Sequence, residues 1–279
     1  MSVSQPLFSV SKLMFKLFSR KKVALEHFSP FSIKIEQVYC SESTLEPFKK
    51  VFTDAKDIPT FAFIAGFRPA LQCLVQAPIP SSLLGLIHLK CDIEIHQEHN
   101  WYLPYDIEVT LKDYTESDKG ITYLITTDFY QMGIKTISNH NLMLDKSKDY
   151  KPKQRECTTK SEINCLTQPL ASWPIGLKTT WSYAKISGDY NPIHLNSFLA
   201  KKLKLKSAIA HGMFNAHECL KQLNKKTDQK LRYVGIEFNK PCFIPSQVFL
   251  RQYNDSNKYG VFSSNKKDRY LKVNVEYFE

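Results

Sequence analysis

The chain has 279 residues, of which 43% are hydrophobic, and its formal net charge at pH 7 is +11 with a pI near 9.2. This length is about twice that of a typical single domain and the apolar content suffices for a large core, so we expect two domain-sized halves. The longest apolar run, residues 58–67, is well short of the roughly 20 residues that cross a bilayer. We therefore expect a soluble protein without a transmembrane segment.

The positive charge calls for an anionic partner, and three classes compete. They are nucleic acid, a membrane surface, and the phosphates of coenzyme A or an acidic acyl carrier protein. The chain contains no nucleic-acid recognition motif, zinc finger or basic region flanked by heptads, so no nucleic-acid partner is expected. Charge alone does not choose between the other two classes.

The seven cysteines are odd in number and form no Cys-x-x-Cys pair, so neither a disulfide framework nor a zinc site is indicated. The histidines of the first half also lack the carboxylate or cysteine spacing of a metal site; they are His88, His96, His99 and His140. We predict no metal, a reducing compartment and a cytoplasmic location.

Residues 1–30 form a basic amphipathic segment with no acidic residue before Glu26. Its apolar stripe is Val10, Leu13, Met14, Leu17 and Phe18. Three interpretations stay open. Residues 1–25 are a transit peptide to the mitochondrial matrix, a helix that seeks a membrane surface, or an N-terminal helix docked on a cytoplasmic protein.

Residues 31–144 read as a strand-rich half around one apolar helix. Alternation at residues 31–35 is typical of a strand, and residues 59–75 are long and apolar. Further strands are predicted over residues 87–95, 107–111, 121–129 and 134–144. Residues 145–165 are polar and predict a linker.

Residues 166–279 repeat this plan. A helix beginning at Gly212 is followed by predicted strands over residues 234–238, 248–250, 259–262 and 271–277. A shift of 141 residues sets Pro104 on Pro245 and the strand 107–109 on 248–250, which indicates a divergent duplication. We expect the two sheets to join into one continuous sheet.

The segment from Ser187 to His194 concentrates the polar chemistry of the chain. Gly188 and Pro192 break helices, so Asp189, Asn191 and His194 are expected in a rigid loop. A carboxylate, an amide and an imidazole that converge from such a loop could hold one water, with acid and base roles near neutral pH. The same pattern is also ordinary turn chemistry.

Downstream, Ala210-His211-Gly212-Met213 precedes apolar residues at helical spacing, so Gly212 is expected to open a helix. Free N–H groups at a helix start attract negative charge. Such a group suits the oxygen of a thioester as it becomes an enolate.

Together these residues resemble the signature of the MaoC-like, (R)-specific enoyl-CoA hydratases and 3-hydroxyacyl-thioester dehydratases. The match runs over Tyr183-Ala184-x-x-Ser187-Gly188-Asp189-x-Asn191-Pro192-Ile193-His194 and Ala210-His211-Gly212-Met213. The resemblance implies an α+β hot-dog fold, in which an antiparallel sheet wraps a central helix. It also implies a hydro-lyase that adds water reversibly to trans-2-enoyl thioesters to give (3R)-3-hydroxyacyl thioesters.

By the same resemblance, Asp189 and His194 activate the water, Asn191 positions them, and the Gly212 N–H forms the oxyanion hole. Further candidate substrate-binding residues are Ser187, His211, Lys201 and Lys202. The basic run Lys201–Lys206 departs from related sequences, which more often carry a glycine and an aromatic residue there. It is read either as a solvated turn or as a contact for pantetheine phosphate.

The first half lacks this chemistry. Under the 141-residue shift, Phe48, Lys50 and Thr53 stand opposite the Asp189, Asn191 and His194 set, and Leu71 stands opposite Gly212. The chain thus resembles double-hot-dog members of the family, in which a non-catalytic N-terminal half accommodates the acyl chain. Candidate tunnel walls that are also ordinary core residues are Phe61, Phe63, Phe67 and Leu71.

The rival class is a hot-dog acyl-thioesterase or a non-catalytic binder of acyl thioesters. The absence of a Gly-x-Ser-x-Gly elbow argues against an acyl-enzyme hydrolase. No cofactor is expected, and coenzyme A and acyl carrier phosphopantetheine both remain open as the substrate handle. A homodimer is an assembly that the sequence allows.

Overall fold

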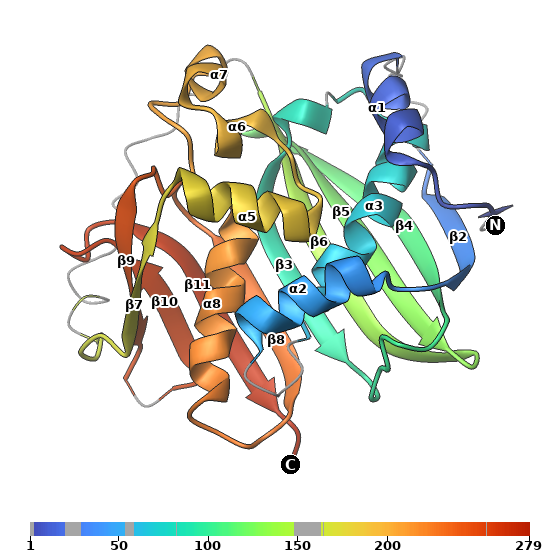
Figure 1. The fold of residues 1–279 in the computed structure, drawn as a ribbon. Helices are drawn as coiled ribbons and strands as arrows, with labels where there is room; N and C mark the ends of the chain where they lie inside the picture. Colours follow the sequence, from blue (N-terminus) through green and yellow to red (C-terminus); the bar gives the residue numbers. More distant parts are fainter. Residues whose placement is uncertain are drawn as a thin grey trace. The chain divides into compact units, whose positions relative to one another are not determined.

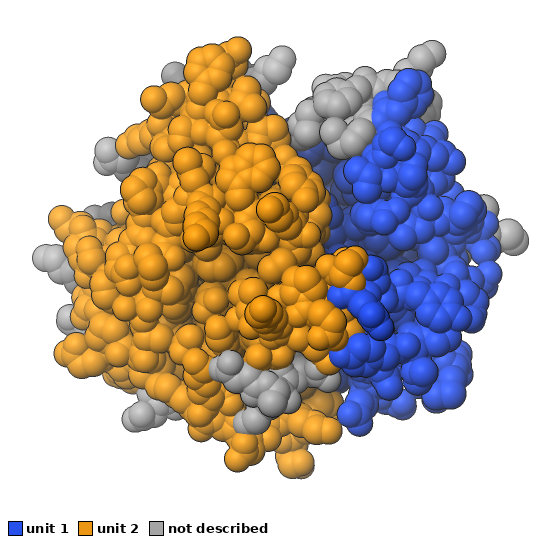
Figure 2. All heavy atoms as spheres, viewed as in Figure 1, with its two compact units in different colours: residues 1–42, 61–151 blue, residues 43–60, 152–279 orange. Residues whose placement is uncertain are grey.

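The computed structural model describes residues 3–19, 29–53, 59–81, 83–147, 163, 165–254 and 256–279. The chain divides into two compact units (Figure 2). Unit 1 consists of residues 1–42 and 61–151, and unit 2 of residues 43–60 and 152–279. Residues 43–60 thus belong to the unit built mainly from the second half of the chain.

Unit 1 is a sheet with its long helix against one face (Figure 1). Its strands follow the order β1-β2-β4-β5-β6-β3; β1 runs parallel to β2, and the other neighbours are antiparallel. The strands are β1 (Val3–Ser4), β2 (Phe31–Val38), β3 (Ile87–Ile95), β4 (Tyr105–Ser117), β5 (Gly120–Gln131) and β6 (Ile134–Lys146). The helices are α1 (Val10–Ser19), α3 (Phe61–Gln76) and the short η2 (Leu83–Gly85).

Alternating burial explains this packing. Ile33 and Ile35 of β2, and Ile107 and Val109 of β4, are fully or almost fully buried, while their neighbours along the strands are more exposed. A Cβ on Gly66 of α3 would lie 3.0 Å from the Thr127 methyl of β5. The helix can therefore lie close to the sheet because this position carries no side chain.

The strands of unit 2 are antiparallel and follow the order β8-β11-β10-β9-β7. Its strands are β7 (Ala171–Ile175), β8 (Leu231–Phe238), β9 (Ser246–Gln252), β10 (Lys258–Phe262) and β11 (Arg269–Tyr277). Its helices are α2 (Glu42–Phe52), α5 (Leu177–Ser187), α6 (Pro192–Leu195), α7 (Ser197–Lys202) and α8 (Gly212–Asn224). The central helix is α8, whose apolar side chains are buried.

The two units repeat one topology. The order β2-β4-β5-β6-β3 of unit 1 corresponds strand by strand to β7-β9-β10-β11-β8 of unit 2. In chain order, a long helix precedes the second strand of each unit's set: α3 precedes β3, and α8 precedes β8. This arrangement confirms the predicted α+β class and double hot-dog fold.

The predicted 141-residue shift holds only for part of the repeat. Strands β4 and β9 begin at residues 105 and 246, which are 141 apart, but helices α3 and α8 begin at residues 61 and 212. Gly212 therefore corresponds to Phe61, and pairing it with Leu71 was wrong. The number of residues that separates corresponding positions is larger at the central helices than at β4 and β9. The reason is that the segment between the first strand and the central helix is longer in unit 2, where it holds α5, α6 and α7.

The other strands and both central helices lie close to their predicted positions, whereas β1, α2, α5, α6, α7 and β7 were not predicted. The N-terminal helix is docked, as one of its three interpretations proposed: Phe8 and Leu13 form a buried cluster with Val75. The side chains of Met14, Leu17 and Phe18 and most of the predicted linker lie outside the described residues. No helix in the described ranges is both long and apolar enough to cross a membrane.

Candidate active site

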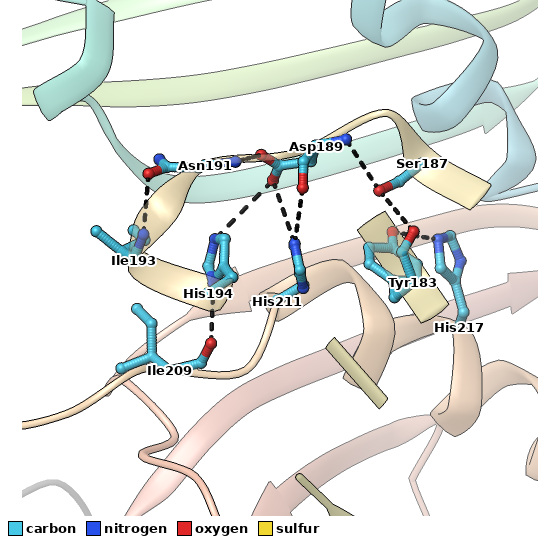
Figure 3. A network of polar contacts seen from close by, with 9 residues as sticks. All are labelled: Tyr183, Ser187, Asp189, Asn191, Ile193, His194, Ile209, His211 and His217. Carbon is cyan, nitrogen blue, oxygen red and sulfur yellow. Dashed lines mark hydrogen bonds and ion pairs between the residues drawn. The ribbon is translucent and has the colours of Figure 1, made fainter. Parts of the chain in front are cut away.

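The predicted loop follows α5 and is closed by its own backbone and side chains (Figure 3). Gly188 caps the helix with φ of 74°, a left-handed conformation that favours glycine, and donates its N–H to Ala184 O at 2.9 Å. The Ser187 hydroxyl donates to Tyr183 O at 2.9 Å and accepts the Asp189 N–H at 3.2 Å. Ser187 is buried, so its side chain holds the loop at the end of α5.

Two side-chain turns then aim the carboxylate of Asp189. Its Oδ1 accepts the Asn191 N–H at 3.1 Å, and the Asn191 Oδ1 accepts the Ile193 N–H at 3.3 Å as the N-cap of α6. Pro192 stands in the first turn of α6, where a missing N–H costs no hydrogen bond. The other carboxylate oxygen, Oδ2, is directed to two histidines (Figure 3).

The tautomer of neutral His194 follows from its hydrogen bond. Its Nδ1 lies 3.0 Å from Ile209 O, and a carbonyl oxygen can only accept, so Nδ1 carries the proton. Burial lowers the pKa of His194 against the opposing effect of Asp189, so the neutral form is favoured. The Nε2 of His194 is then bare: it carries no proton, its lone pair is free to accept a hydrogen bond, and it lies 3.9 Å from Asp189 Oδ2.

His211 plays a different part because its Nε2 is already used. This nitrogen lies 3.0 Å from the backbone oxygen of Asp189 and must donate to it. The ring stacks on that of His194 with centroids 3.9 Å apart. Burial, then the neighbouring His194, lowers the pKa of His211 to about 4, so it is neutral near pH 7. His211 therefore supports the backbone of the loop.

The result is a pair of hydrogen-bond acceptors that face each other. Neither Nε2 of neutral His194 nor Oδ2 of ionised Asp189 carries a proton, and 3.9 Å is too long for a direct hydrogen bond. A water or hydroxyl group that donates to either acceptor suits this geometry. The Asp189 side chain is 26% exposed, so the pair is accessible from solvent.

The same residues must also be tested as a metal site, since Asp189, His194 and His211 offer ligand atoms within 4.8 Å of one another. The Nε2 of His211 carries a proton toward a carbonyl oxygen, so it has no lone pair for a metal. On the side of the rings that faces Asp189, His194 Nε2 and one carboxylate oxygen remain, fewer than the three protein ligands typical of catalytic zinc; the other nitrogen of His211, Nδ1, is buried without a hydrogen-bond partner in the described residues. The cluster is better suited to water, and the prediction of no metal stays a prediction.

A buried polar chain lies behind the site. Tyr183 OH and His217 Nε2 are 3.0 Å apart, and His217 Nδ1 and Thr60 Oγ1 are 2.7 Å apart. The Tyr183 ring packs on His211 with centroids 4.9 Å apart. All three residues of the chain are buried, and burial lowers the pKa of His217 to about 3. Sequence reasoning did not assign His217 or Thr60 to this network, because they are 157 residues apart.

Gly212 opens α8 directly after His211, as predicted. The structure adds a packing reason for the glycine: a Cβ there would lie 2.6 Å from two ring atoms of Phe238 on β8. The ring thus requires a glycine at this position, whatever its N–H binds. The oxyanion role of that N–H stays a prediction.

The remaining candidates lie in two places. Lys201 and Lys202 are exposed on α7, with Lys202 Nζ 4.8 Å from the Phe198 ring centroid. Among the candidate tunnel residues of unit 1, Phe61 is buried against Trp101, and Leu71 lies on the Phe8, Leu13 and Val75 cluster. Phe63 and Phe67 are only half-buried.

The family model described as MaoC like domain matches residues 151–275, a range that holds the loop, His211 and Gly212. This part of the chain is therefore similar to the MaoC-like domain family. The resemblance stated from the sequence motifs is therefore confirmed.

The chain is also similar to a curated protein, 3-hydroxyacyl-thioester dehydratase X of Mycobacterium tuberculosis, to which it is 39% identical over 68 residues. That stretch spans 24% of this chain and 24% of the relative's length. Among solved structures, HtdX of M. tuberculosis has a TM-score of 0.74 at 18% identity, over 88% of this chain and 100% of that chain. A MaoC-like dehydratase from Phytophthora capsici has a TM-score of 0.63 at 15% identity, over 91% and 96%. These structures share the fold of this chain.

Proposed function

We propose that this protein is a hydro-lyase that adds water reversibly to trans-2-enoyl thioesters and forms (3R)-3-hydroxyacyl thioesters. The observation that carries the proposal is the bare Nε2 of His194, 3.9 Å from the Asp189 carboxylate. The name of the M. tuberculosis relative, a 3-hydroxyacyl-thioester dehydratase, supports the same reaction.

In hydration, His194 and Asp189 bind the water through its two hydrogens, which leaves its oxygen lone pair for the substrate. The oxygen forms a bond to C3 of the enoyl thioester while the water proton passes to His194 Nε2. The electron pair of the C2–C3 double bond moves toward the thioester oxygen, and the resulting enolate is stabilised by the Gly212 N–H.

The imidazolium of His194 then returns its proton to C2, and the thioester carbonyl is restored. Burial, which lowers the pKa of His194, makes this imidazolium a readier acid, and the Asp189 carboxylate stabilises it while it lasts. Since one residue accepts and delivers the proton, hydrogen and hydroxyl add to the same face of the double bond. Dehydration runs through the same steps in reverse.

The first test follows loss of the ultraviolet absorbance of the conjugated enoyl thioester, with crotonyl-CoA and a longer trans-2-enoyl-CoA. Asp189→Asn keeps the shape of the side chain and removes its charge, so we expect kcat to fall by about 10²- to 10⁴-fold. Asp118→Asn, the same change at an exposed turn residue, is the control and should retain full activity.

Chiral analysis of the product tests the (3R) assignment, and a thiol trap reports released CoA. Thiol release without hydration would favour a thioesterase instead. Equal hydration rates in wild type and in a folded Asp189→Asn variant would refute the assigned site.

A further inference from the structure

The residues between the catalytic loop and α8 form a compact lobe, residues 195–208, which contains α7 (Figure 1). Its two ends meet at His194: Ile209 accepts the His194 Nδ1–H, and its N–H donates to Ile193 O at 3.0 Å. Within the lobe, Ser197 Oγ lies 3.0 Å from Ser207 Oγ, and the Leu205 N–H donates to Ala200 O at 3.1 Å. The lobe is thus a closed loop that begins and ends at the candidate active site.

The lobe buries small residues and exposes large ones. Ala200 and Ala208 are fully buried. Phe198, Leu199 and Leu203 are 65%, 39% and 53% exposed, and Tyr190 of the adjoining loop is 54% exposed. Large apolar side chains that gather on a protein surface commonly mark an interaction site.

The charge of the lobe is of one sign. Lys201, Lys202, Lys204 and Lys206 are all exposed, and the sequence holds no acidic residue between Asp189 and Glu218. Among the described residues, no carboxylate lies within salt-bridge distance of these four lysines. Large apolar side chains among lysines that have no carboxylate partner in the described residues match a partner with an apolar contact inside an acidic rim.

We propose that this lobe is the docking surface for an acidic acyl carrier protein, which presents the acyl thioester on its phosphopantetheine arm to His194. The inference rests on the proposed function and specifies the carrier to which the acyl group of the substrate is attached. Phe198 follows His194 by four residues, so their Cα atoms are at most about 14 Å apart. A carrier bound here holds its thioester close to the pair Asp189 and His194.

Two other anionic partners fit the lobe less well. The phosphates of coenzyme A need lysines but leave the exposed Phe198, Leu199 and Leu203 without a partner. A membrane surface is generally bound by a longer amphipathic helix, whereas α7 has six residues. Both alternatives are outcomes of the test.

The experiment compares the thioesters of one trans-2-enoyl group with three thiol carriers: a purified bacterial acyl carrier protein, coenzyme A and N-acetylcysteamine. Two variants of the full chain disturb the lobe, Lys204→Glu/Lys206→Glu and Phe198→Ser. The control, Lys258→Glu/Lys267→Glu, makes the same charge change at exposed lysines of unit 2 at the start of β10 and in the β10–β11 turn. For each lobe variant we expect kcat/KM with the carrier to fall about tenfold and with N-acetylcysteamine to stay unchanged.

A titration of wild type and variants with the holo carrier protein gives Kd independently of turnover. A weaker Kd in both lobe variants, with loss of wild-type affinity at high salt, supports the inference. Equal losses with carrier and coenzyme A would assign the lysines to coenzyme A phosphates. Unchanged Kd would refute docking, and variant-sensitive binding to anionic vesicles alone would assign the lobe to a membrane. If wild type hydrates none of the three thioesters, the proposed function fails, and the Kd values still decide the docking.

Discussion

At the residue scale, the candidate site depends on which nitrogen of each histidine carries the proton. Two carbonyl oxygens decide this: Ile209 O fixes His194 with a bare Nε2, and Asp189 O fixes His211 with a protonated one. Two adjacent, stacked histidines thus differ in chemistry: the Nε2 of His194 is a hydrogen-bond acceptor, whereas the Nε2 of His211 donates to the backbone of the loop.

Gly212 offers a test at this scale. Gly212→Ala places a Cβ 2.6 Å from the Phe238 ring, so we expect a loss of about 1–3 kcal/mol in the free energy of unfolding from overpacking. Adding Phe238→Leu should recover part of this loss. Urea unfolding of the single and double variants measures it, and an unchanged midpoint in Gly212→Ala would contradict the packing.

At the element scale, α8 is held by residues far away in the chain. Phe48 and Phe52 of α2 pack on the His217 ring with centroids 5.1 and 5.0 Å away, and Thr60 bonds its Nδ1. Lys221 Nζ of α8 also donates to Val51 O at 2.7 Å. Helix α2 and Thr60 therefore pack on the central helix of unit 2, the unit to which residues 43–60 belong.

Thr60 offers the matching test. Thr60→Val keeps the shape but leaves the buried Nδ1 of His217 without its partner, so we expect a loss of about 1–3 kcal/mol in the free energy of unfolding. Thr60→Ser retains the hydroxyl and should lose less. Chemical denaturation compares them, and equal stabilities of the valine and serine variants would show that the hydrogen bond contributes little.

At the scale of the whole molecule, the two units share one strand topology but differ in the segments that connect their first strand to their central helix. Between the first strand and the central helix, unit 2 holds α5, the loop of Asp189, Asn191 and His194, and the lobe, whereas the corresponding part of the chain in the first repeat holds α2. The division into a non-catalytic half, residues 31–144, and a catalytic half, residues 166–279, stays a prediction.

The buried histidines predict acid sensitivity of the whole fold. Burial lowers the pKa of His99 and His211 to about 4 and of His217 to about 3, below the ordinary 6.5. Below about pH 6.5 the unfolded chain binds protons that the folded chain does not. The free energy of unfolding should therefore fall as pH drops from 6.5 toward 4, by up to about 1.4 kcal/mol per pH unit for each histidine.

Urea unfolding between about pH 7 and pH 4.5 measures this slope. His217→Gln removes one of the three groups and should give a shallower dependence on pH than wild type. The same slope in both proteins would show that His217 does not titrate differently in the folded and unfolded chains.

The sequence by itself determined the strands other than β1 and β7, the two central helices and the loop of Asp189, Asn191 and His194, because alternation, helical spacing and the Gly188 and Pro192 signals are local. It did not predict α5, whose buried positions include the polar Thr180 and Ser187, or α2, whose sequence contains the helix-disfavouring Pro47.

Only the tertiary structure decided the proton positions on His194 and His211, the contact of Thr60 with His217, and the closure of the lobe at Ile209. Each depends on a hydrogen bond between residues distant in the chain, whose partners no local pattern of residues specifies. The sequence therefore supplies the candidate groups, and the packing of α8 against α2 and Thr60 and the folding of the lobe decide how those groups are supported.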